Sequence, residues 1–394
     1  MKQNTTYKQT ELGLIPEDWE VKKLEELGFF FKGKGVPKTS IETEGKYKCL
    51  TYGDLYTKYD YVIKNVKSFI NDASDSQEIN FGDICIAGSG ETIEDIGKCA
   101  VFIDDKTGYA GGDIIIFRSD ENPLTLSYIL NSDLCKRQKY RLGQGHSVVH
   151  IYSSQLQNLK IPLPPLPEQK KIADCLSTWD SAIEKQSALI NVLTQRKKAL
   201  MQQLLTGKKR LPGFSDEWKE VKLGEICEIK KGSQINKIEL SSNLGFPVIN
   251  GGIEPSGYYD DWNVAENTIT ISEGGNSCGF INFIKEKFWS GGHCYTLQNL
   301  KININKIFLF YFLKNSENQI MKLRVGSGLP NIQQKDIKNF EILLPKIEEQ
   351  TAIAEILATA DRELTLQKEK LAQLQTQKKG LMQVLLTGKK RLIN

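Results

Sequence analysis

Two nearly identical stretches of fifteen residues constrain the architecture of this chain more than any other feature. KKALMQQLLTGKKRL occupies positions 197–211 and KKGLMQVLLTGKKRL occupies 378–392, so only two of the fifteen residues differ. The similarity continues upstream at the same offset of 181 residues, where 161–196 and 342–377 agree at twelve of 36 positions. A repeat of this kind indicates that each copy builds the same structural unit. We therefore expect two related halves in this chain of 394 residues.

Apolar residues in both copies follow a heptad pattern that continues for more than four heptads, which predicts two long helices that pack on each other. A polar pair, Gln and Lys, occupies the same two seam positions in each helix and is expected to fix the register. Each helix is predicted to begin near Glu168 or Glu349 and to end at Gly207 or Gly388. About 38 residues would give a rod of ~57 Å. Two separate homodimer interfaces are the alternative. The predicted seam consists of Ile172, Leu176, Ile183, Gln186, Leu193, Leu200 and Leu204 in the first helix, and of Ile353, Leu357, Leu364, Gln367, Leu374, Leu381 and Leu385 in the second.

Several residues outside the seam are also identical between the copies. We predict that they present one surface to two copies of the same partner. A recent duplication is the alternative, although it does not explain why the upstream residues diverged further. The basic residues have a further explanation, because cations favour the C-terminal end of a helix. The candidate docking residues are Lys198, Met201, Gln202 and Thr206, with their counterparts Lys379, Met382, Gln383 and Thr387.

The segments between the helices form two weakly similar globular parts. Trp19 and Trp218 lie near their starts, and YAGGD at 109–113 matches WSGGH at 289–293. Short apolar runs separated by Gly turns predict strands in both, followed by a short helix and a Gly-rich loop. The predicted fold class is α+β, with two pseudo-symmetric domains of mixed α/β structure separated by the two long helices. The expected boundaries are 1–160 and 212–341 for the domains, and 161–211 and 342–394 for the helices with their docking repeats.

Composition narrows the functional classes. The first thirteen residues hold no apolar run, so no signal peptide is expected, and no apolar stretch approaches the length of a membrane span. Eight scattered cysteines without CxxC spacing favour a reducing cytoplasm and argue against a metal site. The two repeats carry a charge of +10 and the remainder about −6, which weakly favours a nucleic acid partner.

Fragments that imitate catalytic motifs do not extend into complete sites. FKGKG at 31–35 and AGSG at 87–90 are similar to a loop that binds S-adenosylmethionine, but no Asn-Pro-Pro-Tyr follows. GSGETIEDIGKC at 88–99 has the wrong spacing for a phosphate-binding loop. GNSCG at 275–279 fits a nucleophile elbow, but the corresponding first segment keeps only the glycine. We therefore expect no catalytic residues and no cofactor in this chain.

Lys-bearing and Gly-rich loops on both segments are suited to DNA instead. Backbone amides and lysines can contact phosphates, and Asn, Gln and Ser can donate to and accept from base edges. For any single residue, a solvated loop is the simpler interpretation. The candidate DNA-binding residues are Lys32, Lys34, Lys38, Lys231 and Lys237 near the first strands, with Ser89, Gln144, Asn276, Ser327 and Asn331 in the Gly-rich loops.

The arrangement resembles the DNA-specificity subunit of type I restriction-modification systems essentially from end to end. Its most specific elements are PPLPEQKKIADCL at 164–176, the paired heptad helices and the repeated LLTGKKRL. The second copy departs slightly, because PKIEEQ at 345–350 lacks one proline.

The resemblance implies two target recognition domains, each recognising one half of a bipartite, asymmetric site in double-stranded DNA, with the helices paired antiparallel. It also implies that two methylation subunits, which would bind S-adenosylmethionine, dock on the repeats and modify adenine N6. Restriction or translocase subunits could join them, and this chain would catalyse nothing. Two alternatives remain. One is the specificity subunit of a related system whose partner combines methylation and cleavage, and the other is a coiled-coil scaffold that does not bind DNA.

Overall fold

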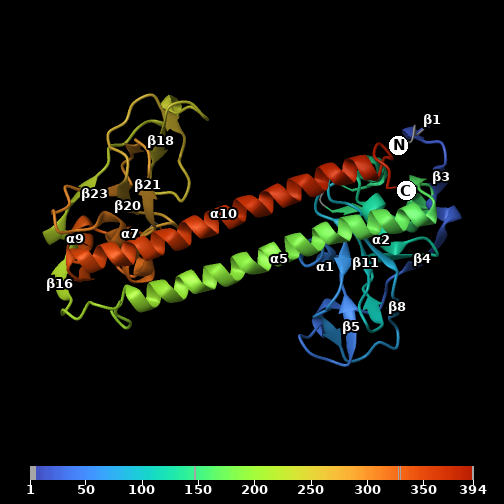
Figure 1. Cartoon of the computed structure of the whole chain (residues 1–394), viewed down its shortest axis with the longest axis horizontal. Coiled ribbons are helices and arrows are strands. Elements are labelled where there is room, and N and C mark those ends of the chain that lie inside the picture. Colours follow the sequence, from blue (N-terminus) through green and yellow to red (C-terminus); the bar gives the residue numbers. More distant parts are fainter. Residues whose placement is uncertain (1–5, 146–147, 327, 329, 393–394) are drawn as a thin grey trace. The chain divides into compact units, whose positions relative to one another are not determined.

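The computed structural model describes residues 6–145, 148–326, 328 and 330–392, and the chain divides into two compact units (Figure 1). Unit 1 consists of 1–185 and 371–394, and unit 2 consists of 186–370. Each unit contains one mixed α/β domain and a part of each long helix. The long helices are α5 (Leu166–Leu204) and α10 (Ile347–Leu385), which start within two residues of the predicted positions.

The domain of unit 1 is built on a five-stranded sheet with the strand order β4-β13-β9-β11-β6. Its strands are β4 (Gly28–Lys32), β13 (Ile114–Ser119), β9 (Ile84–Ala87), β11 (Cys99–Phe102) and β6 (Val62–Ile63). A second sheet has the order β7-β5-β12-β8, formed by β7 (Phe69–Ile70), β5 (Tyr47–Leu50), β12 (Gly108–Ala110) and β8 (Gln77–Ile79). Three two-stranded sheets pair β1 (Tyr7–Thr10) with β2 (Gly13–Pro16), β3 (Glu20–Lys23) with β15 (Lys160–Leu163), and β10 (Ser89–Gly90) with β14 (Val149–His150). The helices are α1 (Tyr52–Thr57), α2 (Pro123–Leu130), α3 (Asp133–Leu142) and α4 (Ser153–Leu156).

The domain of unit 2 repeats the main sheet with the order β17-β23-β20-β21. Its strands are β17 (Glu228–Lys231), β23 (Cys294–Gln298), β20 (Thr268–Ser272) and β21 (Ile281–Ile284). A smaller sheet is formed by β19 (Tyr258–Tyr259), β18 (Phe246–Ile249) and β22 (Trp289–Ser290), and β16 (Lys219–Lys222) pairs with β24 (Glu341–Leu344). The helices are α6 (Leu223–Ile226), α7 (Lys306–Asn315), α8 (Glu317–Met321) and α9 (Gln334–Lys338).

The strands of the main sheets lie where the apolar runs between Gly turns predicted them. All four residues of β9 and all five of β20 are buried, as expected for central strands. Each sheet then leads into an apolar helix, α2 or α7, whose N-terminus is capped by the side chain of Asn122 or Asn305. The α+β class and the two similar mixed domains are therefore confirmed.

The ends of the long helices belong to the domain cores. In unit 1, Ile172 and Leu176 of α5 and Leu385 of α10 pack in one hydrophobic cluster with strands and helices of the domain. In unit 2, Leu204 of α5 and Leu357 of α10 do the same. Burial of these apolar side chains fixes each domain on both helices.

The predicted polar positions of the seam meet partners on the opposite helix. In unit 2, Gln186 Nε2 donates to Gln367 Oε1 at 2.7 Å, and Lys197 contacts Asp361. In unit 1, Lys378 contacts Asp180. Rising residue numbers on α5 thus meet falling numbers on α10, so the two helices pack antiparallel.

Both helices end three residues before the predicted glycines, at Leu204 and Leu385. Gly207 and Gly388 follow the last helical turns with φ angles of +68° and +69°, which L side chains rarely adopt. At Gly388 a Cβ would also lie 2.4 Å from Pro16 Cδ, so the chain closes tightly on the domain there. Within the described residues, no helix is both long and apolar enough to cross a bilayer.

Candidate nucleic-acid interface

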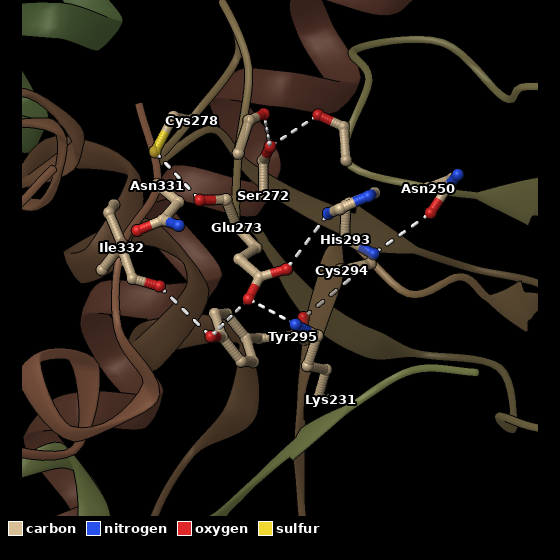
Figure 2. Close-up of polar contacts among 12 residues, drawn as sticks. Lys231, Asn250, Ser272, Glu273, Cys278, His293, Cys294, Tyr295, Asn331 and Ile332 are labelled. Atoms are coloured by element: carbon tan, nitrogen blue, oxygen red, sulfur yellow. Dashed lines mark hydrogen bonds and ion pairs between the residues drawn. The ribbon is translucent and has the colours of Figure 1, made fainter. Parts of the chain in front are cut away.

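Four segments far apart in the sequence converge at one end of the main sheet in unit 2. They contribute Lys231 at the end of β17, Glu273 after β20, His293 before β23 and Asn331 in the loop before α9 (Figure 2). The backbone of Asn331 bridges that of Gly274, which brings the loop of Asn276 beside it. The structure therefore brings two of the predicted DNA-binding residues, Lys231 and Asn331, to one end of the sheet, with the loop of Asn276 next to Asn331.

Glu273 is the centre of this site. Its carboxylate accepts from Lys231 Nζ at 2.5 Å and lies 3.2 Å from His293 Nδ1. The Tyr295 hydroxyl lies 3.0 Å from Glu273 Oε1 and 3.1 Å from the carbonyl oxygen of Ile332. Burial opposes the charge of Glu273, but the hydrogen bonds from Lys231 and Tyr295 outweigh it and lower the pKa of the carboxyl. The carboxylate is therefore ionised at neutral pH.

The same backbone framework recurs in unit 1. There the Gly88 amide donates to Asp113 O at 2.8 Å, and the Ile151 amide donates to Gly88 O at 2.9 Å. In unit 2, Glu273 makes both of these bonds, each at 2.9 Å, with His293 and Ile332. Gly88 is thus the structural counterpart of Glu273.

The side chains on this shared framework differ between the units. Asp113 occupies the place of His293, and Ile115 occupies the place of Tyr295. His150 corresponds to Asn331, because His150 pairs with Ser89 and Gln144 in the same way as Asn331 pairs with Gly274 and Val325. One side chain of the site is the same in both units, because Lys32 corresponds to Lys231. The equivalence follows from the glycine after each lysine: the Gly33 amide donates to Ile114 O and the Gly232 amide donates to Cys294 O. The two ends of the sheets are alike in backbone and unlike in chemistry.

Most of the predicted DNA-binding residues lie on the surface. The exposed ones are Lys32, Lys34, Lys38, Gln144, Lys231, Lys237 and Asn276. Lys38 and Lys237 begin matching 3-10 turns, Lys38–Ser40 and Lys237–Glu239. Asn331 is half-buried, and Ser327 lies outside the described residues.

The choice of Ser89 as a base-contacting residue is contradicted by its burial. Ser89 is 2% exposed, because β10 pairs with β14, and its Oγ lies 2.9 Å from His150 Nδ1. The hydroxyl therefore orients His150 rather than facing a ligand. Four residues of these sites were not predicted from the sequence: His150, Asp113, Glu273 and His293. The one available signal was the matched pair of Gly-Gly segments, in which Asp113 stands opposite His293.

The candidate docking residues divide into two groups. The exposed ones are Lys198, Gln202, Thr206, Lys379 and Gln383, and Thr387 is half-buried. The interpretation of the methionines as docking residues is not supported, because Met382 is 8% exposed inside the core of unit 1 and Met201 packs against the core of unit 2. Their identity between the copies follows from packing.

The basic end of each repeat forms a structural feature that the sequence did not predict. In unit 2, Arg210 makes two hydrogen bonds of 2.8 Å to Glu349 at the start of α10, and Trp218 Nε1 donates to the same carboxylate at 3.1 Å. Unit 1 has the same contacts, which we call the Arg-Glu-Trp clasp. There Arg391 binds Glu168 at 2.8 and 2.7 Å, and Trp19 donates at 2.9 Å. The clasp explains why the repeats keep their final arginine.

Comparisons with known proteins agree with this organisation. The family model described as "Type I restriction modification DNA specificity domain" matches residues 16–195 and 215–376. A Methanocaldococcus jannaschii protein named as the specificity subunit of type I restriction enzyme MjaX is 30% identical, with 98% of this chain and 97% of the relative covered. The MjaVIII specificity subunit of the same organism is 28% identical over 96% of this chain and 95% of its own length.

Solved structures show the same fold. The crystal structure of a type I restriction-modification S subunit from M. genitalium matches with a TM-score of 0.66 at 21% identity, covering 98% of this chain and 97% of the other. A structure from a study of complex assembly in the type I system matches with a TM-score of 0.60 at 20% identity, covering 95% and 99%.

Proposed function

The chain belongs to the type I restriction-modification DNA specificity family, whose members are non-catalytic, and from this premise we propose that it recognises a bipartite, asymmetric DNA site. Each domain binds one half of that site in double-stranded DNA. The paired helices hold two methylation subunits, which modify adenine N6, and restriction subunits can join them. The chain thus directs a reaction that its partners carry out.

The proposal is supported mainly by a contrast within each unit, between the junction of the domain with the long helices and the loops at the end of the main sheet. At the helix junctions the units keep the same side chains, as in the two Arg-Glu-Trp clasps. At the loop ends they keep the backbone and change the side chains, as at Gly88 and Glu273. Helix junctions with the same side chains in both units are suited to binding two copies of one partner. Loop ends with different side chains are suited to binding two different half-sites. A scaffold without DNA binding offers no reason for that contrast.

Charge supports the choice of ligand. The exposed lysines Lys32 and Lys34 in unit 1 and Lys237 in unit 2 can contact the phosphate backbone. Binding that depends on such contacts weakens steeply as salt rises. A chemically similar protein that only recruits partners would lack both the salt dependence and the sequence preference.

Mapping N6-methyladenine across a genome tests the proposal directly. Cells that carry the matching methylation subunit are compared with and without this chain. We expect a two-part motif, methylated on both strands, only when the chain is present. If the subunits co-purify but no motif appears, the scaffold alternative replaces the proposal. A partner polypeptide that both methylates and cleaves would identify the related system instead.

The exposed docking residues give a second expected result. We propose that Lys198 and Gln202 bind one methylation subunit and that Lys379 and Gln383 bind the other. Replacing Lys198 and Gln202 by Glu is expected to weaken that contact at least tenfold, because both substitutions place acidic groups where the partner meets a cation and an amide. Native mass spectrometry should then show one methylation subunit per chain rather than two.

Reversing both pairs should leave the chain without methylation subunits. Lys368→Glu, on the exposed face of α10 outside the repeat, is the matched control and should retain two. A stoichiometry of two in the Lys198→Glu/Gln202→Glu variant would show that the partner docks elsewhere.

A further inference from the structure

At the end of the main sheet in unit 2, four polar side chains are connected through one buried carboxylate. They belong to Lys231, Glu273, His293 and Tyr295, which we call the Glu273 cluster (Figure 2). Glu273 and Tyr295 are buried, whereas the side chains of Lys231 and His293 are 49% and 63% exposed. The cluster therefore holds an ionised acid below the surface and presents two nitrogen-bearing side chains above it.

The buried members fix the exposed ones. Glu273 uses one carboxylate oxygen for Lys231 Nζ and the other for His293 Nδ1, so the ammonium group and the imidazole ring are both held in place. Tyr295 lies between Glu273 and the carbonyl oxygen of Ile332, and this limits movement of the carboxylate. The amide of His293 also donates to Asn250 Oδ1 at 3.1 Å. Groups held in this way lose little freedom when a ligand binds.

The fold does not require the cluster. Unit 1 builds the same backbone framework with Gly88 in place of Glu273 and Ile115, an apolar residue, in place of Tyr295. An ion pair such as Lys231–Glu273, whose lysine is half-exposed, contributes little to stability. Since unit 1 dispenses with the acid and its hydroxyl partner together, stability alone does not account for their presence in unit 2.

We propose that the Glu273 cluster is the base-recognition element of the second domain, in which Lys231 binds the N7 and O6 edge of a guanine. Glu273 is a positioning residue that acts through Lys231. This proposal rests on the proposed function and assigns the chemistry of one half-site.

The choice of guanine follows from the donors that the cluster offers. The ammonium group of Lys231 has three N–H donors and uses one for Glu273. In the major groove, guanine presents two adjacent acceptors, and lysine is among its most common partners. A carboxylate fixed beneath these donors would repel the acceptor edge if it were exposed, but at 8% exposure Glu273 lies behind them. Unit 1, with Asp113 in place of His293, is expected to prefer a different base.

Genome-wide mapping of N6-methyladenine tests the assignment in the full complex. The variants are Lys231→Ala and Glu273→Gln, and Lys230→Ala, an exposed neighbour on the same strand, is the control. We expect Lys231→Ala and Glu273→Gln to relax one guanine position in one half of the motif, with a loss of discrimination of about ten- to a hundredfold. The other half-site should stay unchanged and thereby shows that the complex is folded and assembled.

Two results would overturn the assignment. A uniform loss of methylation at all sites, with the motif unaltered, would make Lys231 a phosphate contact, because such contacts carry no sequence information. An unaltered motif with normal methylation would exclude the cluster from DNA binding. If Glu273→Gln fails to fold, Lys231→Ala decides, because that lysine is half-exposed. A wild-type chain without any two-part motif would instead reject the proposed function itself.

Discussion

Replacing Arg391 with alanine is expected to lower the free energy of unfolding of unit 1 by about 3–5 kcal/mol. The Arg391 guanidinium binds Glu168 and Asp18, and the Glu168 side chain is only 2% exposed. Without the arginine, Glu168 would remain buried with Trp19 Nε1 and the amide of Leu392 as its donors. An uncompensated buried charge is among the few changes that destabilise a protein this strongly.

Chemical denaturation, monitored by hydrogen exchange at the amides of unit 1, measures the loss of stability. Lys389→Ala is the matched control, because that lysine is exposed in the same repeat, and it should change stability by less than about 0.5 kcal/mol. Arg210→Ala should destabilise unit 2 by less, because Arg210 is 27% exposed where Arg391 is 7% exposed. A loss below about 1 kcal/mol for Arg391→Ala would show that the Arg-Glu-Trp clasp is not a main support of unit 1.

Periodicity is the reason that the long helices could be predicted from sequence. The seam residues recur every three or four positions, so Gln186 and Gln367 could be assigned to matching seam positions from the sequence alone. The strands were predictable for a similar reason, since buried apolar runs between glycines have few other uses. The heptad spacing and the apolar runs are both local signals, since each can be recognised within a few residues of the same helix or strand.

The Arg-Glu-Trp clasp could not be predicted in this way. Arg391 and Glu168 are separated by 223 residues, and neither belongs to a periodic pattern. The burial of Met382 was missed for a related reason, because the seam ends where the domain core begins and the helix pattern does not mark that change. Ser89 was misassigned because its burial depends on a two-residue strand pair that has no sequence signature.

The candidate site was predicted in outline only. Lysines beside glycines marked the converging loops, and one of them, Lys231, contacts Glu273. Glu273 was missed because the comparison of the two halves searched for shared residues, and its counterpart is Gly88. Residues that differ between the two domains are those that such a comparison discards. The backbone hydrogen bonds of the folded chain identify the equivalent positions despite the change of side chain.

The Lys378–Asp180 pair gives the second large effect. Lys378 is 5% exposed and lies 3.7 Å from the ring centroid of Tyr61, and Asp180 also accepts from the Tyr128 hydroxyl. Burial lowers the pKa of Lys378, and the contact with Asp180 opposes this shift. Lys378→Glu would place two carboxylates together at the antiparallel seam. We expect this substitution to cost at least about 3 kcal/mol of the unfolding free energy of unit 1.

Exchanging the two charges tests the register of the helices. The variant Lys378→Glu/Asp180→Lys restores opposite charges across the seam, so it should be more stable than Lys378→Glu alone, and a double-mutant cycle measures the coupling. Full recovery is not expected, because Tyr128 would then face an ammonium group in place of its acceptor. Lys379→Glu, at the exposed neighbouring position, should have little effect on the unfolding free energy of unit 1. In unit 2 the same exchange at Lys197 and Asp361 should have a smaller effect, since those side chains are 21% and 39% exposed. If the exchanged variant were no more stable than Lys378→Glu, the two side chains would not interact, and the antiparallel register would need another cause.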